Sequence, residues 1–77
     1  MTAALVLDCR GQRCPRPILE LARHIGDVDI GEQITVEATD PAARPDVQAW
    51  CRMRGHLYVG ETIAPDGTPG YTVRREH

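Results

Sequence analysis

The run Cys14-Pro15-Arg16-Pro17 constrains the fold most, because its two prolines favour the first turn of a helix and exclude a helix interior. Proline is tolerated in that turn because the first N–H groups have no intrahelical partner, and its fixed φ is already helical. The apolar residues that follow recur at helical spacing: Ile18, Leu21, Ala22 and Ile25. We therefore expect a helix over residues 15–24, with Cys14 as its capping residue.

A thiol at the start of a helix is placed for chemistry. The unpaired N–H groups and the positive end of the helix dipole favour an anion there, so Cys14 is predicted to ionise more readily than a free cysteine. Three arginines flank it in sequence and favour the same thiolate: Arg10, Arg13 and Arg16. The alternative is a half-buried structural cysteine, since free cysteines are often buried.

Two blocks of this sequence resemble a known family. Residues 7–17 read Leu-Asp-Cys-Arg-Gly-Gln-Arg-Cys-Pro-Arg-Pro, which is similar to the signature of the TusA (SirA-like) sulfur-carrier family: Leu-Asp, two residues, Gly, two residues, Cys-Pro-x-Pro. The second block is similar to the family's Asp-Pro-Ala loop and second helix: Thr39-Asp40-Pro41-Ala42, Asp46-Val47, Trp50-Cys51 and Gly55-His56. The resemblance runs roughly from Leu5 to Arg74. Gln12 stands where members commonly carry leucine.

The resemblance implies a sulfur relay. Cys14 would accept sulfane sulfur from a donor, hold it as a persulfide and pass it to an acceptor protein. The implied donors are a cysteine desulfurase or a rhodanese, and the implied acceptors a DsrE-like protein or a thiolation enzyme. The implied pathways are tRNA thiolation, sulfur oxidation or molybdenum-cofactor maturation. Arg16 stands where some tRNA-thiolation members have an acidic residue, so partner choice is expected to differ.

Size and composition agree with a small carrier, not a self-sufficient enzyme. A chain of 77 residues is expected to form one domain, residues 1–77. It buries only about 60% of its extended surface, so a deep substrate pocket is not expected. A net charge of −2 argues against general binding to nucleic acid or anionic membrane. We expect a cofactor-free monomer that works with protein partners and binds neither membrane nor nucleic acid directly.

The cysteines and histidines point to a reducing compartment and away from a metal site. Three cysteines are an odd number without the pattern of a disulfide scaffold, and no apolar signal segment comes before the domain, so the cytoplasm is expected. The three histidines are scattered, and the spacing from Cys9 to Cys14 is too wide for a Cys-x-x-Cys pair.

The pattern along the chain predicts the order strand, helix, strand, helix, strand, strand. The strands are expected at residues 4–7, 34–38, 57–63 and 71–74, and a second helix over about 47–54 ends at Gly55. A turn at 65–70 joins the last two strands. A right-handed crossover makes the first two strands parallel, and the final hairpin is antiparallel. This is an α/β (α+β) two-layer sandwich, βαβαββ, with two helices on one face of a mixed four-stranded sheet.

Residues around the thiol have expected supporting roles. Asp8 is predicted to orient the loop by accepting backbone N–H groups, and Gly11 to supply a left-handed or close-approach conformation. Pro15 and Pro17 stiffen the approach to the thiol. Cys9 is either a core residue at the end of a strand or a resolving thiol for Cys14.

Two other functions remain open at this point. One is a redox module in which Cys14 and Cys9 cycle between dithiol and disulfide. The other is a regulatory or RNA-binding module that does not use the thiol. The chain supplies few aromatic side chains for stacking on bases, namely Trp50, Tyr58 and Tyr71, and Trp50 is expected to be buried.

Overall fold

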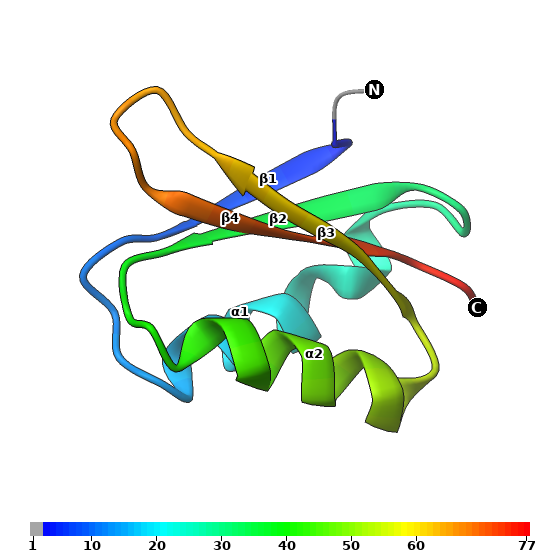
Figure 1. The fold of residues 1–77 in the computed structure, drawn as a ribbon. Coiled ribbons are helices and arrows are strands. Elements are labelled where there is room, and N and C mark those ends of the chain that lie inside the picture. The colour runs from blue at the N-terminus through cyan, green and yellow to red at the C-terminus, as the bar shows by residue number, and fades with distance from the viewer. Residues whose placement is uncertain (1–2) are drawn as a thin grey trace.

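Two helices cover one face of a four-stranded sheet in the computed structural model, which describes residues 3–77 (Figure 1). The strands are β1 (Leu5–Cys9), β2 (Gln33–Ala38), β3 (Leu57–Ile63) and β4 (Pro69–Arg74). The helices are α1 (Arg16–His24) and α2 (Ala43–Arg54), and a short 3-10 turn, η1 (Ile25–Asp27), continues α1. The predicted element order and two-layer arrangement are confirmed. In residues 3–77, no helix is long and apolar enough to span a membrane.

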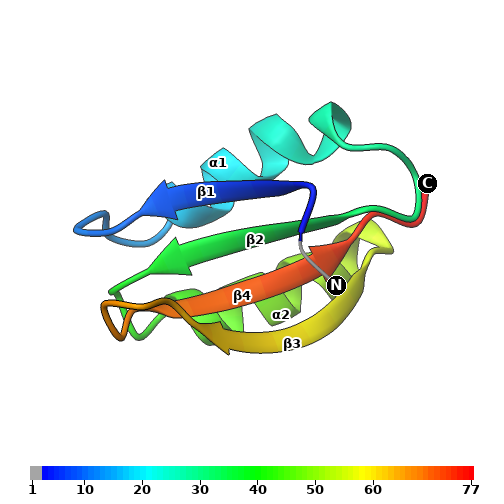
Figure 2. The ribbon, with the colours of Figure 1, turned by 90° about the horizontal axis from the view of Figure 1, so that it is seen from above.

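The sheet is mixed, as predicted. Its strand order is β1-β2-β4-β3, with β1 parallel to β2 and the β3–β4 hairpin antiparallel. Strand β2 also pairs antiparallel with β4. Because β1 and β2 are parallel, their carboxyl ends and the loops that follow them lie at the same end of the sheet (Figure 2). The β3–β4 turn lies at this end as well.

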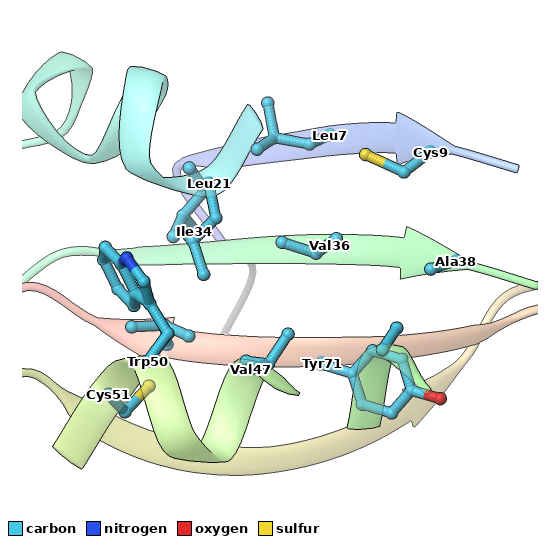
Figure 3. Close-up of a cluster of buried hydrophobic side chains, with 12 residues drawn as sticks. Leu7, Cys9, Leu21, Ile34, Val36, Ala38, Val47, Trp50, Cys51 and Tyr71 are labelled. Atoms are coloured by element: carbon cyan, nitrogen blue, oxygen red, sulfur yellow. The ribbon is translucent and has the colours of Figure 1, made fainter. Parts of the chain in front are cut away.

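The core fills the space between the sheet and the helices (Figure 3). Alternate strand residues face the helices, because side chains of a strand point to opposite faces in turn. Leu21 of α1, Val47 of α2 and Ile34 of β2 are completely buried. Trp50 and Cys51 are buried on α2, as the helical spacing predicts. On the other face, the hydroxyls of Thr35 and Thr72 are hydrogen-bonded to each other at 2.8 Å.

The helix ends differ in part from the prediction. Helix α1 begins at Arg16 and its N-cap is Pro15, so the prediction that Cys14 caps the helix is wrong. Cys14 lies one residue further out, in the loop. Helix α2 ends as expected at Gly55, which has a φ of 75° and donates its N–H to the carbonyl of Cys51 at 2.9 Å.

Other boundaries differ from the predicted ones by one to four residues, because local sequence pattern specifies the ends of an element less well than its type. Helix α2 begins at Ala43, ahead of the predicted 47, and β4 begins at Pro69. Strand β1 extends to Cys9, so Asp8 and Cys9 pair with β2 instead of opening the loop.

Candidate functional site

The loop between β1 and α1 carries Cys14, and local contacts shape its start. Asp8 Oδ1 accepts the backbone N–H of Arg10 at 3.2 Å, which is the kind of contact predicted for Asp8. Gly11 has a φ of 75°, a left-handed conformation that glycine adopts without strain. The chain therefore turns sharply after β1 and returns toward the helix layer.

A second segment, between β2 and the first turn of α2, holds the thiol loop in place. The N–H of Gly11 donates to Thr39 Oγ1 at 2.9 Å, and the N–H of Cys14 donates to Asp40 Oδ2 at 2.9 Å. The other oxygen of Asp40 accepts the N–H of Ala42 at 3.0 Å. Asp40 therefore fixes the backbone of Cys14 relative to the start of α2.

Asp46 contacts the sulfur itself. The Cys14 thiol donates a hydrogen bond to Asp46 Oδ2, from the first turn of α2. This bond, the partial desolvation of the thiol and the negative charges of Asp46 and Asp40 raise the pKa of Cys14 to about 11. The direction is opposite to the one predicted from the helix start and the arginines. A raised pKa favours the protonated form of Cys14, which is half-buried in this structure.

Arg10 does not contribute its charge to the thiol. Its guanidinium forms ion pairs with Asp8 at 2.9 Å, Glu37 at 3.1 Å and Asp66 at 2.9 Å. Asp66 lies in the β3–β4 turn, so this arginine joins that turn to the end of β1. The interpretation of Arg10 as a thiolate-stabilising residue is therefore wrong for the free protein.

Arg13 and Arg16 remain exposed at this end of the molecule, and neither forms an ion pair with any of residues 3–77. Arg13 does affect Asp40. The pKa of Asp40 is lowered first by the N–H groups of Cys14 and Ala42, and to a smaller extent by the charge of Arg13. The two arginines are available to a partner, but neither offsets Asp46 at the sulfur.

The other two cysteines are buried, and all three are free. Cys9 is 1% exposed and Cys51 is 2% exposed, and both side chains belong to the core (Figure 3). Burial raises the pKa of Cys9 and raises that of Cys51 to about 11. Of the three, only Cys14 is partly open to solvent, so it is the one that a partner can reach without unfolding of the core.

The remaining loop residues have structural positions. Pro15 is exposed at the helix start, whereas Pro17 is buried in the first turn of α1. Gln12 lines a hollow of about 380 Å³ between the two loops, and its buried Oε1 has no hydrogen-bond partner within residues 3–77. In the part of the chain that the structure describes, no three His, Cys, Asp or Glu side chains are grouped as metal ligands.

Three residues that contact the thiol loop were not predicted from the sequence to do so. They are Thr39, Asp40 and Asp46. The available signal was that β1 and β2 are predicted parallel, which brings the segment after each strand to one edge. The chemistry of the contact could not be read from spacing, since 32 residues separate Cys14 from Asp46.

Comparison with known proteins identifies the family of the chain. Residues 5–75 match the family model described as Sulfurtransferase TusA. The chain belongs to the TusA family. It is 36% identical over 76 residues to the sulfur carrier protein TusA of Pseudomonas savastanoi pv. phaseolicola, and the match covers 99% of this chain and 89% of that protein. It is 38% identical over 75 residues to TusA of Pseudomonas putida strain GB-1, with 97% and 92% covered.

Two further matches define the extent of the TusA-like region. YrkF of Bacillus subtilis is 38% identical over 60 residues, and the chain covers only 32% of that longer protein. The crystal structure of a SirA-like protein from Desulfitobacterium hafniense superposes with a TM-score of 0.78 at 19% identity, covering 95% of this chain and 99% of that one. The TusA-like fold therefore accounts for nearly all of the residues described here.

Proposed function

We propose that this chain is a sulfur carrier that holds sulfane sulfur as a persulfide on Cys14 and passes it to an acceptor protein. One observation carries the assignment of the residue: Cys14 of the Cys-Pro-Arg-Pro run is the only cysteine of residues 3–77 that is not buried. Two relatives of the chain are named sulfur carrier protein TusA, and this supports the role of a sulfur carrier for the chain.

Loading is a sulfur transfer without net oxidation. Cys14 loses its proton, and the thiolate attacks the terminal sulfur of a donor persulfide. A bond forms between Cys14 Sγ and that sulfur while the S–S bond of the donor breaks, and the donor thiolate takes up a proton. Unloading repeats the step with an acceptor thiolate as the attacking group. The carrier needs an accessible sulfur and no enclosed pocket.

The proposed partners are those that the likeness to the TusA family implies. A cysteine desulfurase or a rhodanese is the proposed donor, and a DsrE-like protein or a thiolation enzyme the proposed acceptor. The outlet is tRNA thiolation, sulfur oxidation or molybdenum-cofactor maturation. We place the relay in the cytoplasm, because the three free cysteines favour a reducing compartment.

The redox alternative is less well supported. A disulfide between Cys14 and Cys9 would require Cys9, 1% exposed in the core, to move out of its packing. An RNA-binding role has little aromatic surface to use, since Trp50 and Tyr71 are buried.

Intact mass spectrometry without reductant tests the proposal. The wild type and Cys14→Ser are incubated with a cysteine desulfurase and cysteine, or with a rhodanese and thiosulfate. The expected result is a gain of one sulfur atom in the wild type that reductant removes, and no gain in Cys14→Ser. No gain with either donor, together with a loss of two hydrogen atoms to an added mild oxidant that links Cys9 to Cys14, would instead support the redox module.

A further inference from the structure

The charge around Cys14 is the wrong sign for its proposed reaction. Transfer requires the thiolate of Cys14. In the structure, however, the thiol of Cys14 donates a hydrogen bond to Asp46, and the backbone N–H of Cys14 donates one to Asp40. Removing the thiol proton would leave a sulfur anion in contact with the Asp46 carboxylate. Like charges in direct contact disfavour ionisation, so the contact with Asp46 favours the protonated form of Cys14, which is the less reactive one.

The chain's own cations do not correct this in the free protein. Arg10 is shared among three carboxylates: Asp8, Glu37 and Asp66. The charge of Arg13 acts on Asp40, and neither Arg13 nor Arg16 forms an ion pair with any of residues 3–77. The groups that face the sulfur are therefore acidic, and they come from the segment before α2 and from its first turn.

We propose that Asp46 keeps Cys14 protonated in the free carrier, and that a sulfur donor activates the thiol by placing a cationic group against the Asp46 carboxylate. This rests on the carrier function proposed above. A cation paired with Asp46 removes the repulsion, the thiol proton leaves to solvent, and the thiolate attacks the donor persulfide as already described. The donor surface that meets this end of the molecule therefore carries lysine or arginine beside its persulfide.

Small disulfides of different charge test the proposal without any sulfur donor. Cystamine is cationic, hydroxyethyl disulfide is neutral and dithiodipropionate is anionic. The rate of mixed-disulfide formation at Cys14 is measured for each at pH 8 by mass spectrometry, and is normalised to the rate of the same reagent with glutathione. We expect the wild type to react several-fold faster with the cationic reagent than with the neutral one, and slowest with the anionic one.

The variant Asp46→Asn should remove both the suppression of Cys14 ionisation and the preference for a cationic disulfide. If the pKa of Cys14 falls from about 11 to its ordinary value of 9.0, the thiolate fraction at pH 8 rises roughly 100-fold while nucleophilicity falls roughly tenfold. The rate with the neutral disulfide should therefore rise about tenfold, and the preference for cystamine should disappear. Asp29→Asn is the matched control, because it removes one exposed carboxylate at the opposite end of β2. Asp46→Glu should keep the preference.

Two results would overturn the proposal. A wild-type preference for the anionic disulfide would mean that Arg13 and Arg16 govern access to the sulfur. An unchanged rate and pH profile in a folded Asp46→Asn protein would mean that Asp46 does not hold the thiol proton. Neither result bears on whether Cys14 can be loaded with sulfur, which the mass measurement tests separately.

Discussion

At the scale of single residues, Cys14 is controlled by partners that are distant in sequence. The arginines nearest to it along the chain predict an easily ionised thiol, whereas the carboxylate of Asp46 determines its protonation in the fold. A thiol of high pKa is slow to react with general oxidants and alkylating agents, because the thiolate is the reactive form. The resting carrier is protected until a partner changes its surroundings.

Gly11 offers a test of the loop that presents the thiol. Its φ of 75° is strained for any residue with a side chain, although an added Cβ would meet no atom within 4 Å. We expect Gly11→Ala to lower the free energy of unfolding by roughly 1–2 kcal/mol through backbone strain alone. Urea unfolding measures this. Gly26→Ala is the control, because Gly26 has equally open surroundings without a positive φ. Equal effects of the two substitutions would contradict the explanation.

The contacts of the site fall into two groups, according to whether the partner is near or distant along the sequence. The contact of Asp8 is to the N–H of Arg10, two residues on, and turn chemistry predicts it. The side chain of Arg10 bonds to Asp66, 56 residues away, and Cys14 to Asp46, 32 residues away. Such pairs depend on which loops the sheet brings together, so no local pattern predicts their geometry.

At the scale of elements, α1 is anchored by one face. Leu21 is fully buried against the sheet and α2, whereas Leu19, on the same helix, is 59% exposed. The helix therefore presents Cys14 from a fixed base. Its opposite face leaves Leu19 beside Arg16 and Arg23 on the surface.

Two leucine substitutions on α1 separate packing from propensity. Leu21→Ala should cost about 2–5 kcal/mol, because it removes a fully buried side chain and leaves a cavity. A domain of 77 residues has roughly 4–12 kcal/mol of stability, so this loss is a large fraction of the total. Leu19→Ala makes the same chemical change on an exposed site and should cost less than about 0.5 kcal/mol. Similar losses for both in thermal unfolding would contradict the assigned packing.

Element types were predictable because they depend on local pattern. Strand β2, the helical spacing in α2 and the glycine that ends α2 all appear in the sequence and in the structure, although Thr35 on the outer face of β2 is buried as well. The predicted start of α1 is one residue early. Proline is typical of the first helical turn, and Pro15, which the sequence pattern assigns to that turn, is the N-cap instead.

At the scale of the whole molecule, the topology positions the site. Two parallel strands and their following loops meet at one end, and a two-layer domain leaves that end open to partners (Figures 1 and 2). The sequence therefore predicted the fold and the end of the sheet where the thiol lies. It did not predict the sign of the charge around the sulfur, because that sign depends on the contact between the two loops.

The most direct test of the central claim follows one sulfur atom onto and off the carrier. The protein is loaded with radiolabelled sulfur from cysteine by a cysteine desulfurase, purified, mapped by peptide mass spectrometry, and mixed with an excess of acceptor thiol. We predict that the label lies on the Cys14 peptide only and that Cys9→Ala and Cys51→Ala load normally. We also predict that the label is transferred from Cys14 to the acceptor thiol. Label on Cys9 or Cys51, or label that the acceptor thiol cannot remove, would contradict a carrier that works through Cys14.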